Sequence, residues 1–581
     1  MSEPLLVRVW APHAERVDLV VGDRAVPMVR GADDVFEQEA SAAHGERYGI
    51  RLDGGAVRPD PRAVWLPDGV HSPGAVYHHD RFAWTDEGWT GRPWEQAVVY
   101  ELHVGTFTPD GTFDAATRRM EHLVDLGVTH VELLPVCAFD GVAGWGYDGV
   151  APWSVHEPYG GPDGLKAFVD AAHRHGLAVI LDVVHNHLGP SGAYLSELGP
   201  FFTDRYHTPW GESVNLDGPG SDQVRAYLLG SLSAWVHDFH VDGIRLDAVH
   251  EMQDNRAVPF LEEISAAMDG WSSRLGRPLV TVAESDRNDP WTVMPRGQGG
   301  LGMTAQWDDD VHHALHAWLT GESQGYYADF AADPPTALQT VLTAAFLHAG
   351  GYSSFRGRSH GRPVDRAAVP GYRFVASLQT HDQVGNRALG ERLPALVPDG
   401  HLAAGAALLP LGPFVPMLFM GEEWAASTPW LFFSSFDDPD LAAAVTQGRR
   451  AEFADHGWRA ADVPDPQAPG TVERSRLVWD ERHDPRHAAM LAWYRHLLRL
   501  RHTHPQLRDP RLDQVRVEAT DEVVTMHRGD VRVAASVADQ PRTVVLDRPV
   551  GTVLASFGRV AGLDGPSTEV LLGPGSAAVL R

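Results

Sequence analysis

Between residues 98 and 502, short apolar segments typical of β-strands alternate with amphipathic segments typical of α-helices. The predicted strands cover residues 98–104, 130–135, 178–184, 243–250, 279–284, 303–307, 374–382 and 414–420, and the clearest predicted helices cover 115–126, 164–175, 222–237 and 486–502. Repeated strand–helix units imply parallel strands. Eight of them predict a closed TIM (β/α)8 barrel, whose active site lies at the carboxyl ends of the strands.

The chain on either side of this region has a different pattern. Runs such as 5–10 and 16–21 alternate apolar and polar residues between Gly, Pro and Asp turns, which predicts an N-terminal β-sandwich. Short strands and turns return after about residue 515 and predict a C-terminal antiparallel β domain. We therefore expect a multidomain α/β chain with a sandwich and linker at 1–94, a barrel with inserted loops at 95–508 and a β domain at 509–581.

The composition limits the compartment and the partners. The net charge of −29 would repel a phosphate backbone, so we expect no nucleic-acid partner. The uncharged run 402–420 contains three prolines, and it predicts a buried helix followed by a strand, not a membrane span. The single cysteine, Cys137, allows no intrachain disulfide, and the N-terminus carries no signal pattern, so we expect a cytoplasmic protein without a membrane partner.

Three of the predicted strands end in a carboxylate. Arg245 and Asp247 lie two residues apart and so share one face of their strand, while two later strands lead into Glu284 and Asp382. Considered alone, the Arg245–Asp247 pair is equally typical of a structural ion pair. Three acids at the same end of one barrel indicate a shared site.

Carboxylates that converge at a barrel mouth, without a phosphate-binding glycine loop or cysteine ligands, are typical of glycosidic bond cleavage. Arg245 would keep Asp247 ionised for attack on the anomeric carbon. Glu284, in a less cationic setting, would stay protonated as the acid/base, and Asp382 would bind sugar hydroxyls and stabilise positive charge in the transition state.

Histidines and aromatic residues form a second set near the same strand ends. His185 and His187 follow the third strand, His381 precedes Asp382, and Trp145-Gly-Tyr-Asp148 follows the second strand. Zinc binding is the competing interpretation of the histidines, but no HExxH helix or other compact ligand spacing is present, so we predict no metal. We expect neutral imidazoles that donate to sugar hydroxyls. The aromatic rings either bind sugar or pack within their loop.

Four short segments, residues 182–187, 243–247, 282–285 and 379–383, resemble the signature regions of the α-amylase superfamily of glycoside hydrolases and transferases. The resemblance implies that Asp247 is the nucleophile, Glu284 the proton donor and Asp382 the transition-state stabiliser. It also implies that the N-terminal sandwich is of the carbohydrate-binding type found in glycogen-modifying members. Around the sugar at the point of cleavage it places Tyr147, His187, Arg245 and His381.

Further passages, residues 145–152, 306–316, 325–330 and 420–424, are similar to the malto-oligosyltrehalose trehalohydrolase family within that superfamily. This similarity implies retaining hydrolysis of the α-1,4-glucosidic bond next to the terminal trehalose unit of malto-oligosyltrehalose, with no cofactor. It also implies a functional pairing with a trehalose-forming synthase that acts upstream. Asp308, where we expect Asn, and Ala425-Ala426, where a Gly is usual, depart from the family pattern and bear on subsite detail.

The resemblance gives a set of substrate-binding residues in which His250 and the segment 308–313 lie on the trehalose side. The set is Trp145, Tyr147, Asp182, His187, Arg245, His250, Asp308, Asp309, His313, His381, Gln383 and Asn386. Two other functions stay open at this point. A glycogen branching enzyme would share the sandwich, barrel and acids, whereas a non-catalytic glucan-binding protein would be favoured by the loss of an acid, and none is lost.

Overall fold

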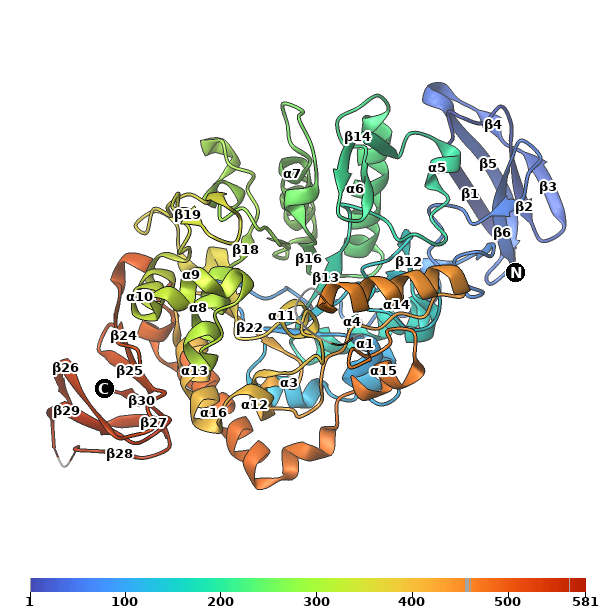
Figure 1. Ribbon diagram of the computed structural model, residues 1–581. Helices are drawn as coiled ribbons and strands as arrows, with labels where there is room; N and C mark the ends of the chain where they lie inside the picture. Colours follow the sequence, from blue (N-terminus) through green and yellow to red (C-terminus); the bar gives the residue numbers. More distant parts are fainter. Residues whose placement is uncertain (1, 455–458, 460, 564) are drawn as a thin grey trace.

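The computed structural model describes residues 2–454, 459, 461–563 and 565–581. Eight parallel strands form a closed barrel in which each strand pairs with the next along the chain and the last pairs with the first (Figure 1). These strands are β9 (Val99–Leu102), β10 (His130–Leu133), β13 (Ala178–Val183), β16 (Gly243–Leu246), β17 (Val280–Ala283), β18 (Ala305–Trp307), β21 (Phe374–Ser377) and β22 (Val415–Phe419). The predicted TIM barrel is confirmed.

Helices cover the outside of the barrel because their apolar faces pack on the outward side chains of the strands. The main ones are α4 (Gly161–Arg174), α6 (Ser221–His237), α7 (Phe260–Leu275), α8 (Asp309–Thr320), α10 (Pro334–Ala344), α13 (Asp399–Leu411) and α16 (Pro485–Thr503). A further helix, α14 (Pro439–Ala454), is mostly exposed, and its Val445 lines a cavity at the mouth of the barrel. Inside the barrel a separate small core contains Val99, Ile180, Val282, Trp307 and Val415. These side chains fill the interior of the barrel beneath the carboxyl ends of the strands.

Several details of the barrel differ from the sequence predictions, among them the strand predicted at 374–382, which ends at Ser377. The predicted helix 115–126 is broken into α2 (Phe113–Thr117) and α3 (Met120–Leu126). The unit after β17 contains two short 3-10 turns in place of an α-helix, at Pro290–Thr292 and Arg296–Gln298, in a stretch where prolines and glycines interrupt helical hydrogen bonding. The strand predicted at 243–250 ends at Leu246, because Ala248 adopts a left-handed conformation with φ of 38°.

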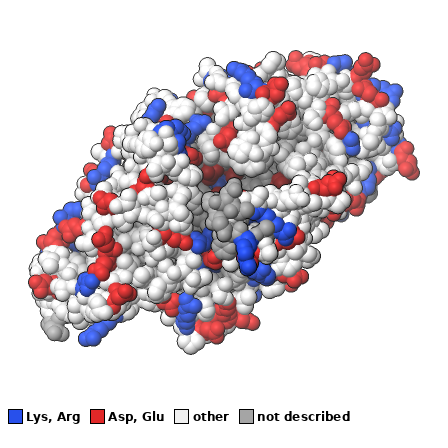
Figure 2. All heavy atoms as spheres, viewed as in Figure 1, with Lys and Arg blue, Asp and Glu red and all other residues white. Residues whose placement is uncertain are grey.

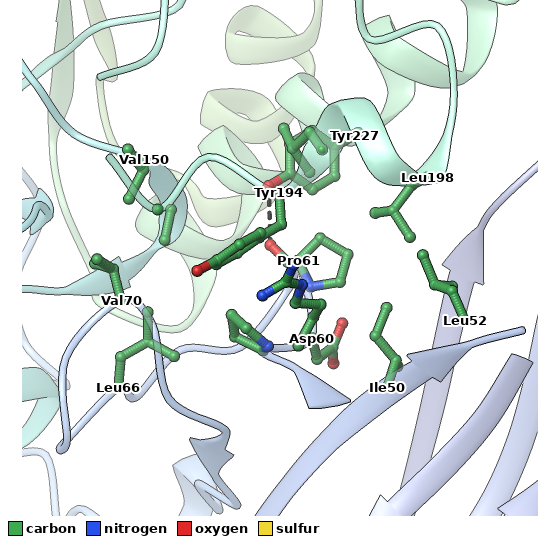
Figure 3. Close-up of a pocket in the computed structure, with 15 residues that line it drawn as sticks. Ile50, Leu52, Asp60, Pro61, Leu66, Val70, Val150, Tyr194, Leu198 and Tyr227 are labelled. Carbon is green, nitrogen blue, oxygen red and sulfur yellow. Dashed lines mark hydrogen bonds between the residues drawn. The ribbon is translucent and has the colours of Figure 1, made fainter. Parts of the chain in front are cut away.

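The N-terminal region forms two antiparallel sheets that lie beside the barrel at the N-terminal end of the molecule (Figure 1). The first contains β1 (Ser2–Trp10), β5 (Val35–Ala43) and β4 (Val29–Arg30). The second contains β2 (Val17–Val21), β3 (Arg24–Pro27), β6 (Arg47–Leu52), β7 (Val57–Arg58) and β8 (Gly74–Ala75). Figure 3 shows where this region meets the barrel: Ile50 and Leu52 face a small cavity, and the Tyr227 hydroxyl of α6 donates to the Pro61 carbonyl at 2.8 Å.

The C-terminal region forms two further antiparallel sheets at the opposite end of the molecule (Figure 1). One contains β23 (Val515–Ala519), β24 (Val523–Arg528), β25 (Val531–Ser536), β30 (Ser576–Leu580) and β27 (Val553–Phe557), and the other contains β26 (Arg542–Val550), β29 (Ser567–Leu572) and β28 (Val560–Ala561). The flanking antiparallel regions are therefore confirmed. The boundaries at 94/95 and 508/509 stay predictions.

The uncharged run 402–420 lies in α13 and β22 and is buried, as predicted. Among the described helices, none combines the length and apolar character that a membrane crossing needs. Cys137 is buried, and burial raises the pKa of its thiol to about 12. Figure 2 shows acidic and basic residues interspersed over the visible face.

Candidate active site

The three predicted catalytic acids lie at the carboxyl ends of neighbouring or nearby barrel strands. Asp247 directly follows β16, Glu284 directly follows β17, and Asp382 lies in the short helix α11 (His381–Gly385) that follows β21. The register sets Arg245 opposite both Asp182 and Val282 on the flanking strands. The barrel therefore brings the predicted acids and Arg245 to one mouth.

Both carboxylate oxygens of Asp247 have a partner. Arg245 Nη1 lies 2.7 Å from Oδ1, and the Asn186 side-chain amide donates to Oδ2 at 2.8 Å. The same amide also donates to the Asp247 backbone carbonyl at 2.9 Å. These contacts fix the position of the carboxyl group, as a nucleophile requires.

The Glu284 carboxyl group has a different environment. Its Oε2 accepts the backbone N–H of Ala248, the residue in the left-handed conformation, and lies 4.0 Å from Arg245 Nη2. Burial raises the pKa of Glu284 well above its usual value, and although Arg245 opposes this shift, the charges of Asp247 and Asp382 add to it. A carboxyl group whose pKa is raised keeps its proton to a higher pH and can give it to a leaving oxygen.

Asp382 and His381 begin helix α11, where the Thr380 hydroxyl accepts the Asp382 N–H. The Asp382 side chain is 44% exposed and so faces the open side of the site, 3.4 Å from His381 Nε2. The prediction of a neutral imidazole is wrong for His381. Burial lowers its pKa, but Asp382 and Glu101 outweigh burial and raise the pKa of His381 to about 9, which keeps the ring protonated at neutral pH.

Asp182 and Trp307 fix the position of the Arg245 side chain. Its Nη1 lies 2.9 Å from both oxygens of Asp182, and its guanidinium group lies 4.2 Å from the centre of the Trp307 ring. The Tyr147 hydroxyl donates to Asp182 at 2.5 Å. Burial raises the pKa of Asp182 to about 6 against the effect of Arg245. Since Asp182 is buried behind Arg245 and Tyr147, it orients these two groups, and its own contact with sugar stays a prediction.

One side of the mouth is a cavity with an aromatic lining. The His187 ring stacks on Trp210 with centres 4.4 Å apart, and its Nε2 lies 3.0 Å from the Tyr147 carbonyl. Trp145 is buried, packs on Trp430 and donates to the Leu431 carbonyl at 2.9 Å. Burial lowers the pKa of His187, so here the prediction of a neutral imidazole agrees with the structure. Further lining comes from Leu188, Phe432, Phe433 and Phe436.

The residues expected on the trehalose side differ in how far they are exposed. His250 Nδ1 accepts the Asp286 N–H at 3.2 Å, close to Glu284 in sequence. Asp309 is partly exposed, accepts the Gln383 amide at 3.2 Å, and has a pKa that burial and the charge of Asp382 raise to about 7. Asn386 is exposed at the end of α11.

Asp308 and His313 are both buried, as His381 is. Asp308 is 2% exposed before the first turn of α8, and burial raises its pKa well above the usual value. His313 is buried and stacks on Tyr326 with ring centres 4.5 Å apart, and burial lowers its pKa to about 3. A direct sugar contact from either residue stays a prediction.

Sequence reasoning missed three residues that contact the predicted set. Glu101 in β9 binds His381, Asn186 binds Asp247, and Trp210 in the hairpin of β14 (Phe202–Thr208) and β15 (Gly211–Val214) stacks on His187. The signal for Glu101 was a carboxylate within an otherwise apolar strand. Trp210 is 51% exposed in a tight turn, which sequence cannot distinguish from ordinary loop packing.

No group of three or more His, Cys, Asp or Glu side chains suited to a metal ion occurs within residues 2–454, 459, 461–563 and 565–581. Asn186, which follows β13, has a side-chain oxygen of the kind that can bind calcium. That oxygen already contacts His187 Nδ1, and the amide nitrogen donates to Asp247.

Comparisons with known proteins agree with this geometry. The protein-family description "Alpha amylase, catalytic domain" matches residues 76–201. A solved structure titled as a putative α-amylase from Salmonella typhimurium superposes with a TM-score of 0.91 and is 37% identical, with coverage of 100% of this chain and 98% of that one. The fold and the site therefore define a glycoside hydrolase of the α-amylase class.

More similar relatives give a narrower assignment. The malto-oligosyltrehalose trehalohydrolase of Arthrobacter ramosus is 50% identical over 577 residues, which are 98% of each chain. That of Rhizobium sp. (strain M-11) is 48% identical over 583 residues, which are 99% of this chain and 97% of the relative. The chain belongs to the malto-oligosyltrehalose trehalohydrolase family.

Proposed function

We propose that this chain hydrolyses the α-1,4-glucosidic bond next to the terminal trehalose unit of malto-oligosyltrehalose and releases trehalose with retention of configuration. The names of its full-length relatives support the substrate. One structural observation carries the chemistry: Asp247 is fixed by Arg245 and Asn186, while the pKa of Glu284 on the next strand is raised by burial. One acid is thus prepared to attack and the other to protonate.

The two displacements use these groups in turn. In the first, an Asp247 oxygen forms a bond to the anomeric carbon, the glycosidic C–O bond breaks, and the Glu284 proton moves to the departing trehalose oxygen. In the second, the Glu284 carboxylate takes a proton from water, the water oxygen attacks the anomeric carbon, and the bond to Asp247 breaks. Asp382 and protonated His381 face the same space and are available to hold sugar hydroxyls in both steps.

Two alternatives lead to different products. A branching enzyme would use the same first displacement but transfer the glucan to a hydroxyl of another chain. A silent glucan-binding protein would leave every substrate intact, and the presence and placement of all three acids count against it. The positions of the three acids are the same for a hydrolase and for a glucan transferase. The reaction products distinguish the two activities.

The deciding experiment incubates the purified chain with maltosyl-trehalose, maltoheptaose and amylose and separates the products by chromatography. The proposal expects trehalose and maltose from maltosyl-trehalose and slower cleavage of the two glucans that lack a trehalose end. Longer branched products from amylose would favour the branching enzyme. Glucose from maltosyl-trehalose without trehalose would contradict the proposed substrate.

We also infer a place in a reaction sequence and in the cell. The substrate carries a trehalose linkage where a malto-oligosaccharide has its reducing end, so an enzyme that rearranges this end must act upstream. A cytoplasmic location is part of the same proposal, and the cytoplasmic glucan pool would supply both enzymes. Fractionation of the native host with an antibody against the chain tests the location, and recovery of the chain outside the cytoplasmic fraction would contradict it.

A further inference from the structure

A buried acid that the proposed mechanism does not use lies directly behind His381. Glu101 is the third residue of β9, and its side chain is 1% exposed. One carboxylate oxygen, Oε1, lies 2.5 Å from His381 Nδ1, and the other accepts the His381 backbone N–H at 3.0 Å. A single side chain therefore holds both the ring and the main chain of His381.

This double contact has a geometric consequence. Because Nδ1 is committed to Glu101, the opposite ring nitrogen, Nε2, points towards Asp382, 3.4 Å away. The ring plane is fixed as well, since it stacks on Tyr147 with centres 5.0 Å apart and at 20°, and it meets the edge of Trp145. His381 therefore has one orientation, with an Nε2–H available to Asp382 and to a sugar hydroxyl beside it.

We propose that Glu101 is the positioning residue that fixes the orientation of His381 and keeps its ring protonated during the reaction. The inference rests on the proposed function, because it assigns a role to His381 in the cleavage site. Glu101 itself is buried and acts through His381, without touching the substrate.

The surroundings of His381 agree with a charged ring. Burial lowers the pKa of His381, and Arg245 opposes protonation too, but the charges of Asp382 and Glu101 raise the pKa to about 9. Neutralising Glu101 removes one of these two anions and leaves burial and Arg245 in place. The titratable groups that face the ring from the surrounding elements are Glu101, His103, Glu132, Tyr147, Asp182, Arg245 and Asp382.

The chain offers a matched control on the adjacent strand. Glu132 of β10 lies opposite Glu101 in the register and is buried like it. Burial and the charge of Glu101 raise the pKa of Glu132 well above the usual value, which favours the neutral form of this carboxyl group. Glu132→Gln therefore removes a buried carboxyl group on the adjacent strand, whereas Glu101→Gln removes the carboxyl group that contacts the ring and the backbone of His381.

The first test compares the pH profiles of kcat/KM for the two variants and the unaltered chain. For Glu101→Gln we expect a loss of at least about tenfold at neutral pH and an alkaline limb that moves down by about one to three pH units, because the His381 ring now loses its proton near neutrality. Glu132→Gln is expected to keep the position of the limb. Glu284 contributes to the same limb in all three chains, so the comparison is with Glu132→Gln: a Glu101→Gln profile that matches Glu132→Gln in both rate and limb overturns the proposal.

A second test needs neither a substrate nor a substitution at Glu101. The chain is produced with 15N-labelled histidine, and the His381 ring signals are identified by their absence in His381→Gln. At pH 7.5 we expect both ring nitrogens of His381 to have the shifts of a protonated imidazole, and a neutral ring overturns the proposal. Since this readout is independent of turnover, failure here is distinct from failure of the proposed substrate, which would leave the ring charged but yield no trehalose.

Discussion

The proposed role of Asp247 as nucleophile depends on its carboxylate oxygens. Asp247→Asn keeps the volume of the side chain but replaces the oxygen that must bond to the anomeric carbon, so we expect loss of hydrolysis with the fold retained. Initial rates on maltosyl-trehalose, with the melting temperature as a control for folding, check this. A rate within about tenfold of the unaltered chain, which is less than about 1.4 kcal/mol of barrier, would exclude Asp247 as nucleophile.

The raised pKa of Glu284 makes a prediction about pH. The group works as an acid only while it is protonated, so activity on maltosyl-trehalose falls as the pH rises through its pKa, which burial shifts upward. Glu284→Gln removes the proton donor at every pH. We expect it to lose most activity on maltosyl-trehalose but to keep substantially more on a maltosyl fluoride, whose leaving group needs no proton. Equal losses on both substrates would contradict the acid role.

Among the secondary-structure elements, helix α4 carries a lysine, Lys166, that attaches the linker at residues 77–94 to the barrel. Lys166 in α4 is the only lysine of the sequence and is fully buried. Its Nζ donates to the His79 carbonyl at 3.1 Å and lies within 6 Å of the centres of four rings, those of Tyr77, Phe82, Trp84 and Phe239.

Lys166→Met keeps the aliphatic length but removes the cation and the donor, so we expect a loss of about 2 kcal/mol of stability. Thermal unfolding and the rate of proteolysis within residues 77–94 measure the effect. Lys166→Arg, which keeps the charge, is the matched control and is expected to lose less. An unchanged melting temperature and proteolysis rate for Lys166→Met would show that this contact does not fasten the linker.

The elements also show what sequence could and could not predict. Apolar runs that alternate with helical patterns predicted all eight barrel strands, since each strand is a continuous buried run. The barrel brings Asp247, Glu284 and Asp382 to one end. These patterns could not predict the left-handed Ala248 that follows β16, because the group that accepts its backbone N–H, Glu284, lies at the end of a different strand. The charge of His381 was missed for the same reason: Glu101 lies 280 residues away in sequence and reaches it only through closure of the barrel.

On the scale of the whole molecule, we propose that the C-terminal unit, residues 509–581, completes the barrel and does not fold apart from it. Trp318 of α8 donates to the Asp521 carbonyl at 3.0 Å, Arg366 donates to the carbonyls of Leu512 and Val515, and Trp493 of α16 packs against Phe557. A chain that ends at Arg508 would expose the apolar surface around Trp493.

We therefore expect the chain 1–508 to accumulate as insoluble material under conditions in which the full chain is soluble. The soluble fraction after expression, followed by size-exclusion chromatography, measures this. A soluble and active 1–508 chain would contradict the proposal and would also make the barrel independent of the β domain.

The configuration of the released sugar distinguishes a retaining from an inverting mechanism. Two displacements at one carbon restore the α configuration, and they require Asp247 and Glu284 to act as a retaining pair with carboxyl groups about 5–5.5 Å apart. Trehalose has no reducing end, so the only new anomeric signal comes from the released oligosaccharide. Time-resolved proton NMR of maltosyl-trehalose hydrolysis should show α-maltose first, with the β anomer growing only at the rate of mutarotation. Initial β-maltose would contradict attack by Asp247 and the retaining mechanism built on it.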